Sequence, residues 1–132
     1  YYYWGMKVDP RWEGRIPENL PKSLKPDYAV GAHTASLGFV FNKAPGFEQG
    51  AFIGQHGSWN RSEFVGYKVA FIPFVNGKPN GKTQDFLTGF VANKDKKEVH
   101  GRPVGVAFTK HYMLVADDAA NVIWAVIPEK TR

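Results

Sequence analysis

The sequence contains no cysteine among its 132 residues, which excludes disulfide bonds and thiolate metal sites. It also has no apolar run near the roughly 20 residues that a membrane-spanning helix requires, so we expect no membrane span. The first residue is Tyr1 and not methionine, and nothing near it has the charged and apolar sections of a signal peptide. We therefore expect these residues to be part of a longer chain.

Charge of one sign is not concentrated anywhere along the chain. The net charge is +5, but the 17 lysines and arginines are scattered, and the densest cluster is Lys94, Lys96 and Lys97 around Asp95. A short lysine run of this kind is typical of a solvated loop, so we expect no nucleic-acid partner. Hydrophobic residues make up 43% of the chain and aromatic residues 15%, which is enough to build a core.

Convincing helical periodicity is also missing, which favours an all-β fold. Residues 1–35 carry four prolines and little alternation, so we expect an irregular Pro- and aromatic-rich segment packed on a sheet domain that covers residues 36–132. In that domain, short β-branched and aromatic stretches alternate with Gly, Asn and Asp. The predicted strands are 37–41, 51–55, 66–74, 86–91, 104–108, 112–117 and 121–127.

The strands contain an internal repeat. LGFVF (37–41) resembles VGVAF (104–108), AFIGQHG (51–57) resembles MLVADDA (113–119), and GYKVAFI (66–72) resembles NVIWAVI (121–127). Self-similar units of short strands indicate a β-propeller, whose blades are four-stranded antiparallel meanders. We assign one blade to residues 36–91 and the next to 100–128. Because a propeller needs about 4 to 8 blades, the chain is expected to be a fragment of one.

Polar loops are predicted to gather at one end of the sheets. Connections in a meander alternate between the two ends, so the loops 31–36, 56–65, 92–103 and 117–120 should share one end. The opposite end receives ordinary turn sequences. The polar residues of the shared end, the expected mouth of the propeller, are His33, Ser36, His56, Ser58, Asn60, Arg61, His100, Arg102, Asp117 and Asp118.

Two arginines and a tryptophan give this mouth its predicted chemistry. Arg61 and Arg102 carry guanidinium groups that suit carboxylates in a bidentate geometry, although Arg102 could instead pair with Asp117 or Asp118. Trp59 could stack on a planar ligand or a sugar ring, or only seal its loop against a neighbour. Both arginines therefore favour an anionic or multiply oxygenated ligand.

The remaining candidates at the mouth are less specific. His33, His56 and His100 lack the i, i+2 or i, i+4 spacing of metal ligands, so hydrogen bonds to backbone or contact with an anionic ligand compete with a metal site. Ser58 lies in GQHGSW, which is not the G-x-S-x-G nucleophile elbow, and a serine hydrolase is disfavoured. From these residues alone, we therefore assign none of them as a metal ligand or as a nucleophile.

Several blocks resemble a known family. GAHTASLGFVF, GAFIGQHGSWNRSEFVGYKV, DFLTGFV and GRPVGVAF with LVADDAANVIWAV are together similar to the C-terminal part of the sorbosone dehydrogenase group of the glucose/sorbosone dehydrogenase family. The resemblance runs from about Asp9 to Ile127. It implies a six-bladed β-propeller that binds pyrroloquinoline quinone (PQQ) with calcium and oxidises sugars or related aldehydes in the periplasm.

The resemblance also assigns roles to residues of the mouth. Arg102 falls at the second position of an Arg-x-Arg that holds the cofactor's carboxylates in the family, whereas His100 replaces the first arginine and would make binding pH-dependent. A family lysine falls near Gly57, where His56 or Arg61 would have to replace it. Trp59 and His33 are assigned to the substrate rim. The histidine base and the calcium ligands of the family lie in earlier blades, outside this chain.

The sequence thus predicts the last two blades of a PQQ-dependent sugar or aldehyde dehydrogenase, periplasmic or secreted and inactive without the remaining blades. Its partners would be those blades and a small sugar or aldehyde. Two rival functions remain open: a propeller that only binds carbohydrate or protein, and a calcium-dependent propeller lactone hydrolase.

Overall fold

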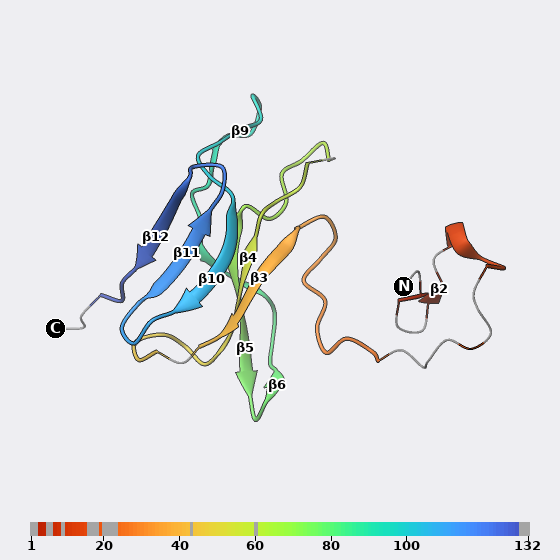
Figure 1. Ribbon diagram of the computed structural model, residues 1–132, viewed down its shortest axis with the longest axis horizontal. Coiled ribbons are helices and arrows are strands. Elements are labelled where there is room, and N and C mark those ends of the chain that lie inside the picture. Colours follow the sequence, from red (N-terminus) through yellow and green to blue (C-terminus); the bar gives the residue numbers. More distant parts are fainter. Residues whose placement is uncertain are drawn as a thin grey trace.

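The protein is all-β in the computed structural model, which describes residues 3–4, 7–8, 10–15, 19, 24–42, 44–59 and 61–129 (Figure 1). The described part has no α-helix, and its one helical turn is the 3-10 turn η1 (Pro10–Trp12). No helix in the described part is long and apolar enough to cross a membrane. The short strands β1 (Tyr3–Trp4) and β2 (Lys7–Val8) pair with each other. These findings confirm the predicted fold class.

The first sheet is an antiparallel meander. Its strands β3 (Ser36–Phe41), β4 (Gly50–Gln55), β5 (Lys68–Val75) and β7 (Gln84–Leu87) pair in that order, and β6 (Lys78–Pro79) pairs with the far end of β5.

The predicted fourth strand, 86–91, was wrong at its C-terminal end. The chain leaves the sheet after Leu87 because Gly89 has φ +97°, which is incompatible with an extended strand. It continues into a separate hairpin of β8 (Val91–Asn93) and β9 (Glu98–Val99).

The second sheet has three antiparallel strands, β10 (Pro103–Phe108), β11 (Met113–Asp117) and β12 (Val122–Val126). Their bounds lie within one residue of the predicted strands. Among the described residues no fourth strand pairs with β12, so this sheet ends at an open edge.

The internal repeat is visible in the strand register. Phe39 pairs with Ile53 in the first sheet, and Val106 pairs with Val115 at the equivalent place in the second. Each ladder has an irregularity at the same point, between Ser36 and Gly38 in one and between Pro103 and Val106 in the other. The first two strands of the sheets are therefore true structural equivalents.

The third pair of the predicted repeat is shifted by one residue. The sequence repeat aligns Val69 with Trp124. In the structure, Gly54 pairs with Val69, and Ala116, the equivalent of Gly54, pairs with Ile123. The structural equivalent of Val69 is therefore Ile123. The shift follows from the connections before these strands, which run over residues 56–67 in the first sheet and 118–121 in the second. A one-residue slip reverses which face a side chain occupies.

The main core lies between the two sheets. Phe52, Val69 and Phe71 of the first sheet pack against Met113 and Val115 of the second, and all five are buried. Burial of apolar area on this scale is the dominant stabilising term in a fold of this kind.

Two glycines let the backbones of the sheets approach closely. A Cβ at Gly38 would lie 2.2 Å from the Val104 carbonyl oxygen, and one at Gly54 would lie 2.3 Å from it. Strand β10 therefore packs directly on β3 and β4.

A second, smaller cluster covers the far face of the first sheet. Ala51, Ile53 and Ile72 are buried there beneath Tyr28 and Val30 of the preceding segment. The Tyr28 hydroxyl donates to the Gly81 carbonyl (3.2 Å) and accepts from Thr83 Oγ1 (3.1 Å). Residues 16–18, 20–23 and most of 1–9 lie outside the described part, so the packing of residues 1–35 as a whole stays a prediction.

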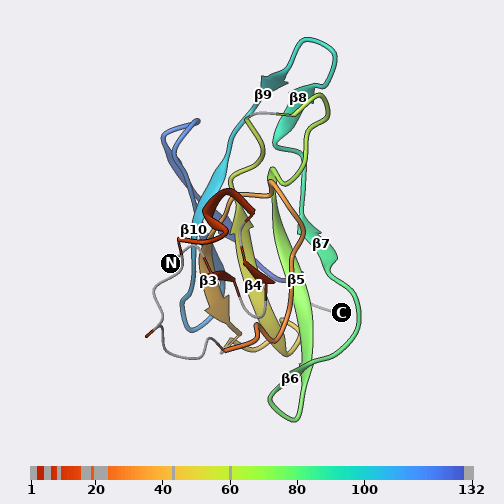
Figure 2. The same cartoon turned by 90° about the vertical axis from the view of Figure 1, so that its right-hand side faces the viewer.

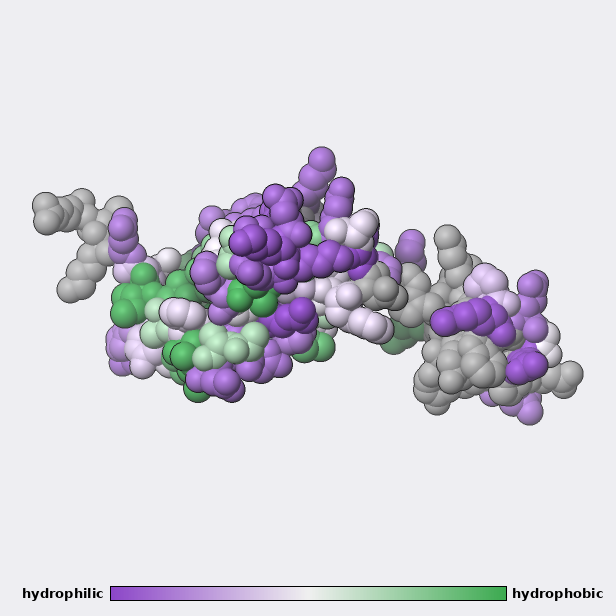
Figure 3. All heavy atoms as spheres, turned by 90° about the horizontal axis from the view of Figure 1, so that it is seen from above, coloured by the Kyte–Doolittle hydropathy of each residue, from purple (hydrophilic) through white to green (hydrophobic). Residues whose placement is uncertain are grey.

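Both outer faces of the pair of sheets expose apolar side chains. Leu37, Phe39 and Phe41 are exposed on β3, and Ile123 and Ile127 are exposed at the β12 end. Seen from above, hydrophobic surface lies at the end of the molecule where β12 is found (Figure 3). Figure 2 shows the β8–β9 hairpin at one end of the sheets and β6 at the other.

Candidate functional site

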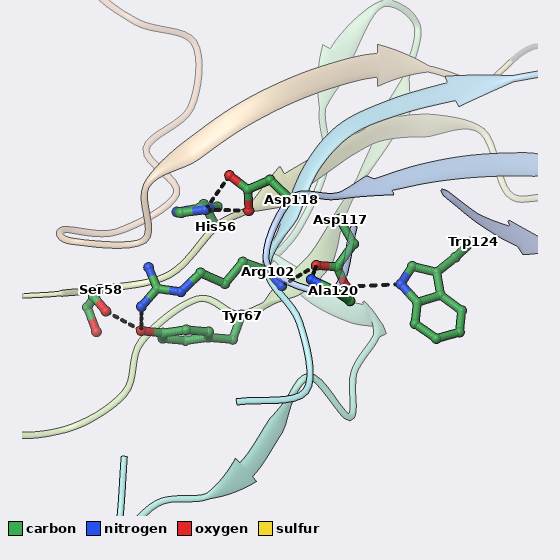
Figure 4. A network of polar contacts seen from close by, with 8 residues as sticks. All are labelled: His56, Ser58, Tyr67, Arg102, Asp117, Asp118, Ala120 and Trp124. Carbon is green, nitrogen blue, oxygen red and sulfur yellow. Dashed lines mark hydrogen bonds and ion pairs between the residues drawn. The ribbon is translucent and has the colours of Figure 1, made fainter. Parts of the chain in front are cut away.

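The loops predicted to share one end of the sheets do meet there. The backbone N–H of His56 donates to the Ala35 carbonyl (2.9 Å), and that of Gly57 donates to the Thr34 carbonyl (3.0 Å). His56 Nε2 also pairs with both carboxylate oxygens of Asp118, at 2.9 and 3.1 Å (Figure 4). The predicted mouth therefore joins loops of both sheets.

The long loop between β4 and β5 is organised around Tyr67. Ser58 closes it, because its backbone N–H donates to the Val65 carbonyl (2.8 Å) and its Oγ accepts from the Val65 N–H (3.1 Å). The Tyr67 ring packs on Gly57 so closely that a Cβ there would lie 2.4 Å from the ring. Gly57 must therefore lack a side chain, which gives a physical reason why no lysine stands at that position.

Arg102 reaches across from the second sheet to Tyr67. Its Nη2 donates to the Tyr67 hydroxyl (3.1 Å), and its Cζ lies 5.0 Å from the centre of the ring, within the range of a cation–π contact. The Tyr67 hydroxyl in turn donates to the Ser58 carbonyl. Figure 4 shows the guanidinium lying beside Ser58 and Tyr67, on the same side as His56.

The two nearby carboxylates are engaged elsewhere. Asp117 is buried and accepts from the backbone N–H of Arg102 (2.8 Å), the N–H of Ala120 (3.0 Å) and Trp124 Nε1 (3.0 Å). Asp118 pairs with His56. Within the described part, no carboxylate pairs with the Arg102 guanidinium. Arg102 does contact Asp117, as the alternative prediction proposed, but through its backbone N–H and not through its guanidinium.

The pKa of Asp117 is held below its ordinary value. Burial acts to raise this pKa, but hydrogen bonds from the backbone of Ala120 and Arg102, from the Trp124 side chain and from the backbone of Ala119 together outweigh burial. Asp117 is therefore an ionised structural group that orients the Arg102 backbone. A Cβ at Gly101 would lie 1.8 Å from its Oδ2, so a side chain at residue 101 would displace this carboxylate.

The other predicted site residues are less constrained. Trp59 is 87% exposed, and Arg61 and His33 are also exposed. His33 has a left-handed backbone (φ +61°) next to Thr34, whose carbonyl accepts from Gly57. Asn60 lies outside the described residues.

His100 faces a different environment from that of Arg102. Its backbone N–H donates to the Phe90 carbonyl (2.7 Å), and the residue lines an apolar groove of about 570 Å³ with Leu87, Phe90, Trp124 and Ile127. Its role in holding a cofactor stays a prediction.

The side chains of His33, His56 and His100 do not come together in this structure. Over the ranges that it describes, no group of three or more His, Asp or Glu side chains is placed to hold a metal ion. Ser58 Oγ serves the loop and donates to the Glu63 carbonyl (3.4 Å), which gives no support to a nucleophile.

Sequence reasoning missed Tyr67 and the pairing of His56 with Asp118. The His56–Asp118 pair could have been predicted, because each residue directly follows the second strand of its repeat unit. Tyr67 had none, since its importance arises from a left-handed turn (φ +56°) that single-sequence patterns do not indicate.

Comparisons with known proteins agree with this architecture. The chain is 34% identical over 122 residues to an uncharacterized protein of Borreliella burgdorferi, covering 88% of this chain. Its structure is similar to the holo form of the pyranose dehydrogenase PQQ domain from Coprinopsis cinerea, with a TM-score of 0.67, 22% sequence identity and 91% of this chain covered. The chain spans 31% of the length of each of these two proteins.

The structural likeness confirms that the two sheets are a fragment of a β-propeller. The TrAA12-like family matches residues 19–129, which include both sheets and every residue of the mouth. This chain belongs to the TrAA12-like family.

Proposed function

We propose that this chain is the C-terminal part of a PQQ-dependent sugar or aldehyde dehydrogenase of the sorbosone or glucose dehydrogenase type. Its two sheets would be the last two blades, 36–91 and 100–128, of a periplasmic or secreted parent protein, the longer chain to which these residues belong. The family and the likeness to a holo PQQ domain support the proposal. The observation that carries it is the Arg102 guanidinium at the mouth.

The residues of the mouth fit a planar anion such as PQQ, which carries carboxylates. A guanidinium has five N–H donors, and Arg102 uses one of them on Tyr67, so a bidentate contact to a carboxylate remains open. His56 lies close by, held by Asp118. Trp59 and Arg61 of the same loop are exposed and would cover the ligand from above.

Each part of the machinery has a distinct contribution. PQQ, when bound, supplies the quinone that takes up the electrons of sugar oxidation. Arg102 and His56 would orient and neutralise its carboxylates, and Trp59 and His33 would form part of the substrate rim. The general base and the calcium ligands belong to earlier blades in this proposal, so the chain alone would not turn over substrate.

The remaining blades are the proposed macromolecular partners of this chain. In the first sheet, Phe52 and Val69 are buried by the second sheet, at 1% and 0% exposure. Their structural equivalents in the second sheet are Leu114 and Ile123, and Ile123 is 69% exposed. The face that is buried in the first sheet is therefore exposed in the second sheet. This exposure is expected if a further blade covers that face of the second sheet in the parent protein.

The proposal is tested by titrating the parent protein with PQQ in the presence of calcium. We expect Arg102→Ala to weaken PQQ binding by about 10-fold or more, since charge-assisted hydrogen bonds are among the strong ones. Lys110→Ala is the matched control, because it removes one positive charge from the exposed turn at the opposite end of the second sheet. Equal PQQ affinity in wild type and Arg102→Ala would rule out the proposed role of the guanidinium.

The exposure of Trp59 favours one alternative, a propeller that only binds carbohydrate. An exposed aromatic ring is a suitable platform for a sugar face. A parent protein that binds no PQQ but loses carbohydrate binding on Trp59→Ala would establish this alternative.

A further inference from the structure

Tyr67 lies at the centre of the mouth, although no sequence motif assigns it a role. Its side chain is buried, with 2% exposure, and contacts both the loop before it and the start of the second sheet. We propose that Tyr67 is a positioning residue that holds the Arg102 guanidinium in place as an uncompensated cation for an anionic ligand. The inference rests on the proposed function for the identity of that ligand, PQQ.

The contacts of the hydroxyl couple the two sheets. The Tyr67 O–H donates to the Ser58 carbonyl of the long loop and accepts from Arg102 Nη2 (3.1 Å), which belongs to the segment entering β10. A single phenol group therefore sets the position of the arginine relative to the loop that carries His56 and Trp59.

The chemistry of the partner matters as much as its position. A carboxylate at this place would orient the guanidinium but would also cancel its charge. A phenol hydroxyl is an uncharged partner, and the ring face attracts the cation without neutralising it. Asp117 and Asp118 are engaged by backbone N–H groups and by His56. Within the described part of the chain, no carboxylate therefore pairs with the guanidinium of Arg102 and cancels its charge.

The backbone at Tyr67 is consistent with a functional constraint. An aromatic residue with φ +56° is an unfavourable use of the left-handed region, and the turn needs Gly66 (φ +85°) before it. A Cβ at Gly66 would lie 2.7 Å from the Thr34 carbonyl oxygen. The unfavourable conformation turns the ring toward Gly57 and the guanidinium.

The test compares Tyr67→Phe with Tyr28→Phe in the parent protein. Tyr28 is a matched control, because its hydroxyl also donates to one backbone carbonyl and accepts from one side chain, but on the covered face of the first sheet. We expect Tyr67→Phe to raise the dissociation constant for PQQ by about 3- to 10-fold, as loss of one hydrogen bond would. Tyr28→Phe should leave the PQQ dissociation constant unchanged.

A double-mutant cycle shows whether Tyr67 acts through Arg102. In the Arg102→Ala background, Tyr67→Phe should change the PQQ dissociation constant by less than about 2-fold. An undiminished effect in that background would overturn the positioning role, because it would mean that Tyr67 acts on the ligand independently.

A second measurement does not depend on PQQ. The ¹⁵N order parameter of the Arg102 Nε–H in cofactor-free protein should fall in Tyr67→Phe and stay unchanged in Tyr28→Phe. An unchanged value in Tyr67→Phe would also overturn the inference. If the wild-type protein binds no PQQ, the proposed function fails, and the order parameter alone decides the role of Tyr67.

Discussion

At the scale of single residues, Asp117 connects several segments around the mouth through hydrogen bonds. Its carboxylate accepts from the backbone of Arg102 and Ala120 and from the indole of Trp124, so it joins the entry to β10, the turn after β11 and the strand β12. A buried acceptor with this many donors is costly to protonate. Its pKa is accordingly below the ordinary value of 3.8.

This lowered pKa predicts an acid-sensitive contribution to stability. A carboxyl group with a lower pKa in the folded state stabilises the fold fully above its unfolded pKa and loses that contribution as the pH falls toward the folded pKa. We expect Asp117→Asn to lower the free energy of unfolding by about 1–3 kcal/mol at pH 7, because the amide group faces donors. The difference from wild type should shrink below about pH 4.

Thermal or urea unfolding between pH 7 and pH 3 measures this effect. Asp85→Asn is a suitable control, because Asp85 is exposed and pairs with Lys68 at the surface, where such pairs contribute about 0–1 kcal/mol. If the free energies of unfolding of wild type and Asp117→Asn changed in parallel with pH, ionisation of this carboxylate would not contribute to the stability of the fold.

The loop from residue 56 to residue 67 is the decisive element of the site. Its length is needed because it folds back on Tyr67 and places His56 beside Asp118 and the loop carbonyl of Ser58 beside the Tyr67 hydroxyl. The equivalent connection of the second sheet, 118–121, is a short turn. The internal repeat therefore supplies the scaffold, and the longer connection in one unit supplies His56, Ser58 and Tyr67 to the mouth.

Gly57 tests whether this loop depends on the ring of Tyr67. Gly57→Ala should destabilise the parent protein by about 2–4 kcal/mol, through strain at φ +97° and through overlap with the ring. Gly89→Ala isolates the strain alone, because Gly89 has the same φ and nothing lies within 4 Å of a Cβ there. Equal losses on chemical denaturation would indicate that the ring yields and that the packing on Gly57 is unimportant.

At the scale of the whole molecule, the two equivalent sheets differ in what covers them. The second sheet packs on one face of the first, but among the described residues no further sheet packs on the corresponding face of the second. Gly38 lies under the Val104 carbonyl, which belongs to the neighbouring sheet. Its equivalent in the repeat, Gly105, has only Ala116 Cβ nearby, at 3.7 Å. In the proposed propeller, a further blade would approach Gly105 as closely as the second sheet approaches Gly38.

This equivalence predicts different effects of one substitution in two contexts. In the parent protein, Gly105→Ala should destabilise by about 1–3 kcal/mol, comparable to Gly38→Ala, because both would obstruct a neighbouring backbone. Within the present 132 residues, a Cβ at Gly105 has room. Tm values of the two variants of the parent protein provide the measurement, and a neutral Gly105→Ala would argue against a covering blade.

Much of the fold was accessible from the sequence because it depends on local patterns. Alternation and turn residues predicted the strands β3, β4, β10, β11 and β12 closely. The repeat predicted two equivalent sheets, and the meander rule placed the polar loops at one end. These features need only the period of the strand and the order of the elements.

Residue type and spacing alone predict the all-β class, the repeat and the polar residues of the mouth. Tertiary structure alone decided that β12 is shifted by one residue against the repeat, that Asp118 binds His56, and that Tyr67 holds Arg102. These contacts join residues 35 to 62 positions apart through a left-handed turn and an unequal pair of loops. Their geometry follows from packing the two sheets against each other, which no local pattern encodes.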